Sequence, residues 1–397
     1  MKKLILGIGM IALLLPNVAN AQEEKKEEGF EFKVVKQVKS TPVKNQHRSG
    51  TCWSFSGLSF FEDELLRMGK GEFDLSEMFV VRNSYADKGE KYVRFHGSLN
   101  FGGGGSFQDV VNTIAKYGIV PESAYKGLQY GEDGHVHGEM DAVLKGYVDA
   151  VLKNKNKKLS TAWVKGMNGI LDAYLGEYPN TFSYNGKEYT PKSFTKELGI
   201  NADNYVMISS YTHHPFYKPF IIEVPDNWSY GSVYNLPLNE MMEVIDNAIQ
   251  NEYAVAWAAD VSEKGFKYNK GVALVPEKKL DDLTDSEKSK WEGLSAKEKA
   301  KQLYDITGPT TEKVITQELR QEEFDNYTTT DDHGMVIEGI ALDQKGNQFY
   351  IIKNSWGESN VYDGYFYASK SFVQFKTMSI LVNKNSIPKN IRKKLGL

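Results

Sequence analysis

The sequence predicts an α+β fold, because helical patterns dominate its first half and its clearest strands come late. Apolar residues recur at helical spacing after Cys52, whereas 333–342 and 349–353 are apolar runs of strand length on either side of a turn at 343–347. The chain has 397 residues, 41% of them hydrophobic, which is enough for a buried core. Its net charge of −4 gives no electrostatic reason to expect a nucleic-acid partner or a membrane surface.

Each expected helix has its own local signal. The first begins at or just before Cys52 and ends near Met68, where two glycines suit a helix C-terminus. A second helix follows Ser76, and a third, at 107–117, follows a turn of four glycines. Further segments are expected at 144–175 (helix), 220–222 (strand), 239–249 (helix), 254–257 (strand) and 283–304 (helix, with Ser295 and Glu298 as a capping box).

The first residues have the pattern of a secretory signal peptide. Two lysines precede an apolar run from Leu4 to Leu15, and Ala19-Asn20-Ala21 is a small-x-small cleavage site. The run is shorter than the roughly 20 residues that a transmembrane helix needs, so an uncleaved anchor is the less favoured alternative. The mature protein is therefore expected to be exported, to a periplasm or the cell exterior, without a membrane segment. The expected organisation is a signal peptide at 1–21, a flexible charged leader at 22–40 and one domain at 41–397.

The chain contains a single cysteine, Cys52, in the stretch NQHRSGTCWSF at 45–55. One cysteine forms no disulfide within the chain, although an exported protein meets oxidising conditions. The thiol is therefore a link between two chains, a buried apolar group or a reactive nucleophile.

The late strands bring two polar residues together. In an antiparallel hairpin, residues equally far from the turn lie opposite each other. The turn at 343–347 lies almost midway between His333 and Asn354. The two side chains are therefore expected within about three residues of register.

These residues suggest nucleophilic catalysis. A helix N-terminus stabilises a thiolate, so we expect the pKa of Cys52 to lie below its usual value of about 8.5. A histidine takes the thiol proton, and an asparagine oxygen fixes the ring's tautomer. Gln46, six residues before Cys52, offers an amide donor that acts with the Cys52 N–H on an oxyanion. Taken singly, Asn354 is equally well a turn residue, His333 a helix or strand cap, and Gln46 a surface amide.

In chain order, Gln46, the stretch SGTCW (49–53), a distant His333 and the stretch NSWG (354–357) resemble papain-type cysteine peptidases. Within that group the sequence is similar to the bleomycin hydrolase and aminopeptidase C branch. Ser49 stands where most secreted papain relatives have a disulfide cysteine. The stretches that carry the resemblance to this branch are GGSFQDVVN (104–112), HHPFYKPF (213–220), VYNLPLNEMMEVIDNAI (233–249) and VAWAADVSEKGF (255–266).

The resemblance covers roughly residues 40 to 385 and implies a fold and a set of roles. The fold is a papain-like pair of lobes, one helical and one of antiparallel β-structure, with a large, mostly helical insertion at about 126–330. The catalytic roles fall to Cys52 as nucleophile, His333 as acid–base, Asn354 as orienter and Gln46 as oxyanion donor. Trp356 shields the bond between histidine and asparagine, and Gly104, Gly105 and Trp53 contact the substrate. No cofactor or metal is implied.

The expected function is that of a cysteine aminopeptidase acting on peptides through a Cys52 acyl-enzyme. The alternatives are a broad cysteine endopeptidase and, from another class, an inactive peptide-binding protein. Two departures from the branch bear on this choice. Residues 22–40 are too few for an inhibitory propeptide, and the tail after 382 is shorter than the C-terminal arm that restricts the branch to exopeptidase action. The short tail also bears on the hexamer that the resemblance implies as a possible homo-oligomer.

Several other patterns carry weaker predictions. His135 and His137 have spacing that suits a metal on a strand, but no further ligand set accompanies them. His213 and His214 are interpreted as a surface or groove pair. The four glycines lack the G-K-[ST] of a nucleotide-binding loop. The basic clusters at 153–158 and 392–394 are interpreted as solvated surface, so no nucleic-acid partner is expected.

Overall fold

The computed structural model describes residues 29–156, 158–277, 295 and 304–397. Within these residues, no helix combines the length and the apolar character that crossing a membrane requires. The predicted signal peptide and the helix expected at 283–304 lie almost wholly outside the described residues.

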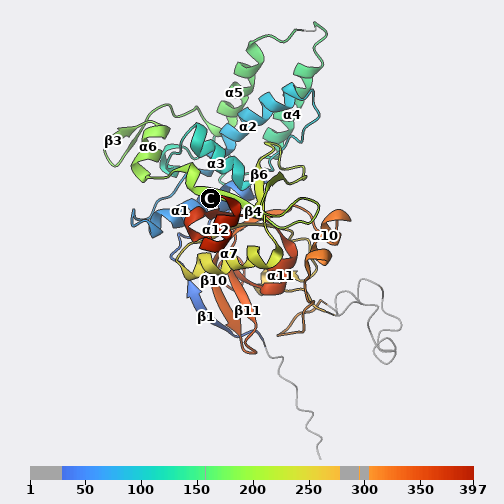
Figure 1. Cartoon of the computed structure of the whole chain (residues 1–397). Coiled ribbons are helices and arrows are strands. Elements are labelled where there is room, and N and C mark those ends of the chain that lie inside the picture. The colour runs from blue at the N-terminus through green and yellow to red at the C-terminus, as the bar shows by residue number, and fades with distance from the viewer. Residues whose placement is uncertain (1–28, 157, 278–294, 296–303) are drawn as a thin grey trace, which may run out of the picture.

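After one strand, helices occupy the first half of the chain, and the remaining strands follow in groups separated by single helices (Figure 1). The helices are α1 (Cys52–Arg67), α2 (Glu77–Arg94), α3 (Phe107–Lys116), α4 (Gly138–Leu152), α5 (Ala162–Leu175), α6 (Pro191–Leu198), α7 (Leu238–Gln250), α10 (Gln317–Asp325), α11 (Lys370–Lys376) and α12 (Lys389–Leu395). The strands are β1 (Phe32–Gln37), β2 (Phe182–Tyr184), β3 (Lys187–Tyr189), β4 (Tyr205–Ser209), β5 (Pro219–Ile221), β6 (Ser232–Asn235), β7 (Val255–Ala259), β8 (Phe266–Lys267), β9 (Val272–Ala273), β10 (His333–Asp343), β11 (Gln348–Lys353), β12 (Tyr365–Ser369) and β13 (Thr377–Asn383).

One large sheet organises the molecule. Its order is β5-β6-β4-β13-β7-β10-β11-β12-β9-β8, and β1 adds to β10. Most neighbouring strands are antiparallel, while β4 with β6 and β9 with β12 are parallel. Helices α2, α3, α4 and α5 lie together on one side of the molecule, at the top of Figure 1, and most of the sheet lies on the other. The predicted α+β class and the papain-like pair of lobes are confirmed.

Helix α1 joins the two lobes. Its apolar side chains, including Leu58 and Phe61, are fully buried, and one face packs on β10. The contact is close because Gly334 has no side chain, and a Cβ there would lie 3.3 Å from the Cα of Trp53. Ser56 Oγ also donates to the Gly334 carbonyl at 2.6 Å. The start of α1 and the start of β10 therefore lie against each other.

The predicted hairpin is present. In it, Val336 pairs with Lys353 and Leu342 with Gln348, with one irregularity between Ile337 and Gly339. Asp343 accepts from the backbone N–H of Gly346 at 3.0 Å and so closes the turn. His333 and Asn354 therefore stand at the same end of the hairpin.

Most predicted elements before the hairpin are confirmed, with one correction. The single helical stretch expected at 144–175 is wrong, because α4 ends at Leu152 and α5 begins at Ala162. The lysine-rich segment between them is exposed where it is described, and it offers no apolar face to hold a continuous helix. The range expected as an insertion, 126–330, contains helices α4–α7 and α10, and it also supplies β4–β9 to the large sheet.

The C-terminal tail packs on α7. Ile391 and Leu395 of α12 are buried, and Lys394 pairs with Glu240 at 2.7 Å. Asn247 on α7 donates to the Ser386 carbonyl at 2.6 Å. The tail is therefore docked on the outside of a helix of the sheet lobe.

Candidate active site

A cavity of about 430 Å³ opens where the two lobes meet. Its walls come from the start of α1, the glycine turn before α3, the segment after β5 and the start of β10. Every residue predicted from the sequence to act at a site lines this cavity except Asn354, which lies behind His333. Those lining residues are Gln46, Cys52, Trp53, Gly104, Gly105, His333 and Trp356.

Cys52 is the first residue of α1, and its side chain is only partly buried. Burial raises the pKa of the Cys52 thiol to about 12, although the backbone N–H groups of Gly334 and Trp53 favour the thiolate. The carboxylates of Asp331 and Asp226 contribute to this raised value. The expectation of a lowered thiol pKa is therefore wrong for the unliganded cleft. A helix N-terminus was visible in the sequence, but the burial and the two acids were not.

His333 is held in one tautomer by Asn354. The Oδ1 atom of Asn354 accepts a hydrogen bond from the backbone N–H of Ser355 at 2.8 Å, which identifies it as the amide oxygen. Because that oxygen also lies 2.7 Å from His333 Nε2, the ring must donate from Nε2. The Nδ1 atom then carries the lone pair and is the basic nitrogen. Burial lowers the pKa of His333 to about 4, against the opposing hydrogen bond to Asn354.

Trp356 covers this histidine–asparagine pair. Its ring stacks on the His333 ring with centroids 4.5 Å apart and planes inclined by 29°. Tyr268 packs edge-on against Trp356, with the two ring centroids 5.0 Å apart. The indole therefore covers one face of the His333 ring, and its role as a shield of the bond to Asn354 stays a prediction.

Gln46 is turned toward the cleft by a residue that the sequence interpretation did not single out. Ser355 Oγ donates to Gln46 Oε1 at 2.7 Å, and Gln46 N donates to the Ser355 carbonyl at 2.9 Å. With the oxygen bound, the amide nitrogen of Gln46 is left without a partner among the described residues. Ser355 directly follows Asn354, so one short segment positions both Gln46 and His333. That adjacency was the available sequence signal.

The glycine turn at 102–105 forms the opposite wall. A Cβ on Gly105 would lie 2.8 Å from the Trp53 ring, and Trp53 Nε1 donates to the Gly103 carbonyl at 2.9 Å. Lys88 supports the turn from behind, because its Nζ donates to the Gly102 and Gly104 carbonyls at 2.7 and 2.5 Å. Trp53 and the glycines thus build one surface, and Lys88 is a further residue that the sequence interpretation missed.

His135 and His137 lie beside this site without joining it. The backbone of Arg48 pairs with this segment, donating to His135 and accepting from His137. Both histidines are buried, and both ring nitrogens of His137 lack a partner among the described residues. Burial lowers the pKa of each to about 4. These two rings are therefore core histidines.

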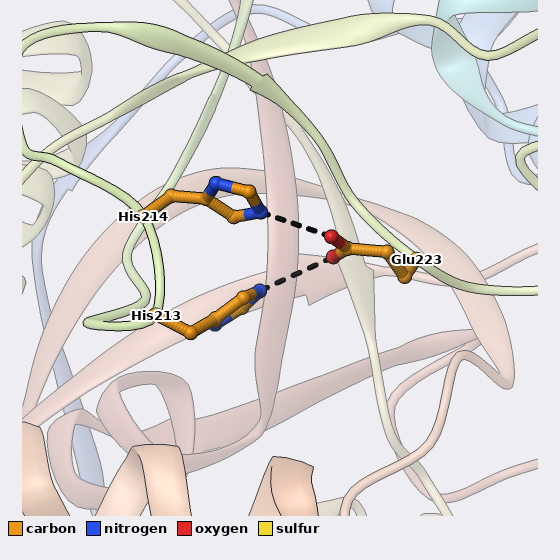
Figure 2. Close-up of side chains that lie close together, drawn as sticks. All are labelled: His213, His214 and Glu223. Atoms are coloured by element: carbon orange, nitrogen blue, oxygen red, sulfur yellow. Dashed lines mark hydrogen bonds and ion pairs between the residues drawn. The ribbon is translucent and has the colours of Figure 1, made fainter.

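His213 and His214 converge on Glu223, as Figure 2 shows. Their Nε2 atoms lie 3.1 and 2.9 Å from the two oxygens of Glu223. Gln321 fixes the His213 tautomer, because its oxygen accepts from Thr212 N and its nitrogen faces His213 Nδ1 at 3.0 Å. The proton of neutral His213 is therefore on Nε2, where a metal ligand would need a lone pair. The cluster is a hydrogen-bonded surface group.

The fold and the arrangement in the cleft define a papain-like cysteine peptidase: a thiol at a helix N-terminus, a histidine held by an asparagine, and a cleft between two lobes. The family model described as the Peptidase C1-like family matches residues 13–305 and 298–396, so the chain belongs to this family.

Similar proteins span nearly the whole chain. An aminopeptidase C of Lactobacillus delbrueckii subsp. lactis is 25% identical over 396 residues, covering 88% of this chain and 81% of that protein. An aminopeptidase C of Listeria monocytogenes is 24% identical over 390 residues, covering 89% and 83%. The crystal structure of PepW from Lactobacillus rhamnosis superposes with a TM-score of 0.67 at 19% identity, covering 92% of this chain and 84% of that one.

Proposed function

We propose that the protein is a cysteine aminopeptidase that removes N-terminal residues from peptides. The observation that carries the proposal is the single cleft shared by Gln46, Cys52 and His333, with Asn354 fixing the histidine tautomer. Relatives named aminopeptidase C cover most of the chain, which favours this activity over that of an inactive binding protein.

In the acylation step, Cys52 Sγ attacks the carbonyl carbon of the first peptide bond as its proton passes to His333 Nδ1. Burial disfavours a charge on either group alone, but this transfer creates two opposite charges side by side, and their attraction opposes the cost. The oxyanion accepts from the Gln46 amide and the Cys52 N–H, which as the first N–H of a helix has no intrahelical partner.

Collapse of the tetrahedral intermediate breaks the carbon–nitrogen bond. His333 gives its proton to the leaving amine, and the shortened peptide departs, leaving a thioester on Cys52. His333 Nδ1 then takes a proton from water, whose oxygen attacks the thioester carbon. The N-terminal amino acid is released, and the thiol recovers its proton from His333. Asn354 holds the ring in place through both steps.

The proposal is tested with two fluorogenic substrates that differ only at the N-terminus. One carries a free amine and the other is N-acetylated. An aminopeptidase hydrolyses the first and spares the second. Equal kcat/KM for both would reject exopeptidase action and establish the alternative, a cysteine endopeptidase.

We also propose that the protein is exported with residues 1–21 removed. The support is the charged start, the apolar run and the small residues at 19–21. Mass spectrometry of the intact protein from the host cell tests this: a mature chain beginning at Gln22 is expected, and an intact Met1 in the cytosolic fraction would contradict it. The homo-oligomer implied by the family resemblance stays a prediction, which light scattering of the purified chain tests.

A further inference from the structure

The catalytic cleft is acidic. Three of the described residues that line the cleft carry a carboxylate, whereas no described lining residue is a lysine or an arginine. The three are Asp226, Asp331 and Asp332. A peptidase cleft for general peptide segments has no need of several negative charges beside its nucleophile.

Asp332 is accounted for by its own loop. Its carboxylate accepts from Thr330 Oγ1 at 2.7 Å and from Ser262 N at 3.1 Å. The residue is exposed, so water solvates what these bonds leave unsatisfied. Asp332 therefore needs no ligand.

Asp331 is different, because its carboxylate has no hydrogen bond and no ion pair with any described residue. The residue is half-buried in the wall of the cleft, two positions before His333. Burial is the main cause that raises the pKa of Asp331 to about 7, and the charges of Asp226 and Asp332 contribute to that value. A partly buried carboxylate without a partner loses part of its solvation, and a cation bound beside it offsets that loss.

Asp226 faces the same space from the segment after β5. Its Oδ1 accepts from Asn100 Nδ2 at 2.8 Å. Its Oδ2 lies directly against the glycine turn, since a Cβ on Gly104 would come within 2.1 Å of that oxygen. Burial raises the pKa of Asp226, and the charge of Lys88 opposes this, but the Lys88 ammonium donates to backbone carbonyls rather than to the carboxylate. Oδ2 is therefore a second acceptor without a hydrogen bond.

The two carboxylates line the same cavity as the nucleophile. Both Asp331 and Asp226 act electrostatically on the Cys52 thiol, and Asp226 acts on Asp331. A cation placed between them would thus sit within the cleft, near the carbonyl that Cys52 attacks. In a peptide, the α-ammonium group is the cation nearest to the first peptide bond.

On the basis of the proposed function, we propose that Asp331 and Asp226 bind the α-ammonium group of the substrate's N-terminal residue. Their charges select a free N-terminus, because an acylated or internal residue would leave both carboxylates desolvated and unpaired. The residues that make this selection belong to the cleft walls. The C-terminal tail takes no part in it, because no described residue after Ser379 lines the cleft.

The test compares the free-amine and N-acetylated substrates on the full chain and three variants. Asp331→Asn and Asp226→Asn each remove one proposed contact at constant size. Glu223→Gln is the matched control, since it lies three residues before Asp226 on the same segment and faces His213 and His214 outside the cleft (Figure 2). Reaction of Cys52 with an uncharged thiol reagent counts the active sites in each sample.

For the free-amine substrate, we expect kcat/KM to fall about 100-fold in Asp331→Asn and at least about 10-fold in Asp226→Asn. Cleavage of the N-acetylated substrate should stay at its low wild-type level or rise, and the count of reactive Cys52 reports that the variants are folded. Glu223→Gln should keep the wild-type ratio of the two substrates. A double variant, Asp331→Asn with Asp226→Asn, that retains this ratio would overturn the inference while leaving the aminopeptidase proposal standing. A wild-type enzyme that cleaves both substrates equally would instead remove the proposed function on which the inference rests.

Discussion

At the scale of single residues, the site depends on how the side-chain amides of Asn354 and Gln46 are held by their neighbours. Ser355 N identifies the oxygen of Asn354, and Ser355 Oγ hydrogen-bonds the side-chain amide of Gln46 at Oε1. One serine therefore sets both the tautomer of His333 and the direction of the oxyanion donor.

Gln46→Ala should lower kcat about 10²–10³-fold with little change in KM, because one oxyanion donor contributes about 2.7–4 kcal/mol to the transition state. Ser355→Ala should cost less, about 10-fold, since the amide remains but its orientation is no longer held. Steady-state kinetics with the free-amine substrate measures both. A Ser355→Ala variant that loses as much as Gln46→Ala would show that the serine does more than orient the glutamine.

The pH dependence separates Asp331 from the catalytic pair. Asp331 is protonated below its raised pKa of about 7, so kcat/KM for the free-amine substrate should rise as the pH increases through that value. In Asp331→Asn, this limb should vanish and the loss of activity at low pH should move toward 4, where buried His333 becomes protonated. The charged or titratable groups around Asp331 are Asp226, Asp332, His333, Cys52 and, through Asp226, Lys88. Identical acid limbs in the two enzymes would contradict the role given to Asp331.

At the scale of elements, the hairpin of β10 and β11 shows what a sequence reveals well. A turn at 343–347 and two apolar runs were sufficient to place His333 near Asn354, because strand register follows from counting residues. The break between α4 and α5 was missed, since helical patterns on both sides hid a solvated lysine segment. Asp226 and Asp331 were missed for another reason. They line one cavity only because the segment after β5 folds against the glycine turn, and no sequence periodicity predicts that contact.

The buried segment at 135–137 should make stability depend on pH. The folded pKa of His137, about 4, lies below the unfolded value of about 6.5, so the unfolded chain binds the proton first as the pH falls. The free energy of unfolding should therefore decrease from about pH 6.5 down to about pH 4, by about 1–3 kcal/mol for this residue.

His137→Leu should flatten that part of the curve, because it removes the titrating ring and its unpaired nitrogens. Chemical denaturation at several pH values measures the effect. A His137→Leu variant with an unchanged slope between pH 6.5 and 4 would contradict the burial argument.

At the scale of the whole molecule, the cleft forms where a helical lobe meets a sheet lobe, and the C-terminal tail is engaged elsewhere. Helix α12 packs on α7, so its contribution is to stability. The sequence indicated a short tail but not where it packs, because the pattern of a seven-residue helix does not specify which surface it contacts.

Deletion of residues 388–397 should lower the free energy of unfolding by about 2–5 kcal/mol, because it removes the buried side chains of Ile391 and Leu395 and exposes the apolar surface they cover. The ratio of free-amine to N-acetylated cleavage should not change. Lys394→Ala is a milder control that removes only partly exposed contacts, with Glu240 and Tyr217, and the ion pair with Glu240 is worth under about 1 kcal/mol. Loss of the ratio in a truncated chain that remains folded would place the tail in substrate selection.

The most direct measurement concerns Cys52 itself. Wild-type protein and Cys52→Ala are compared for hydrolysis of the free-amine substrate, with thermal unfolding recorded for both. We expect the variant to lose all measurable hydrolysis and to unfold cooperatively within a few degrees of the wild type, because the side chain is small and only partly buried. Hydrolysis by folded Cys52→Ala at a rate near that of the wild type would contradict the thiol mechanism and every role assigned around it.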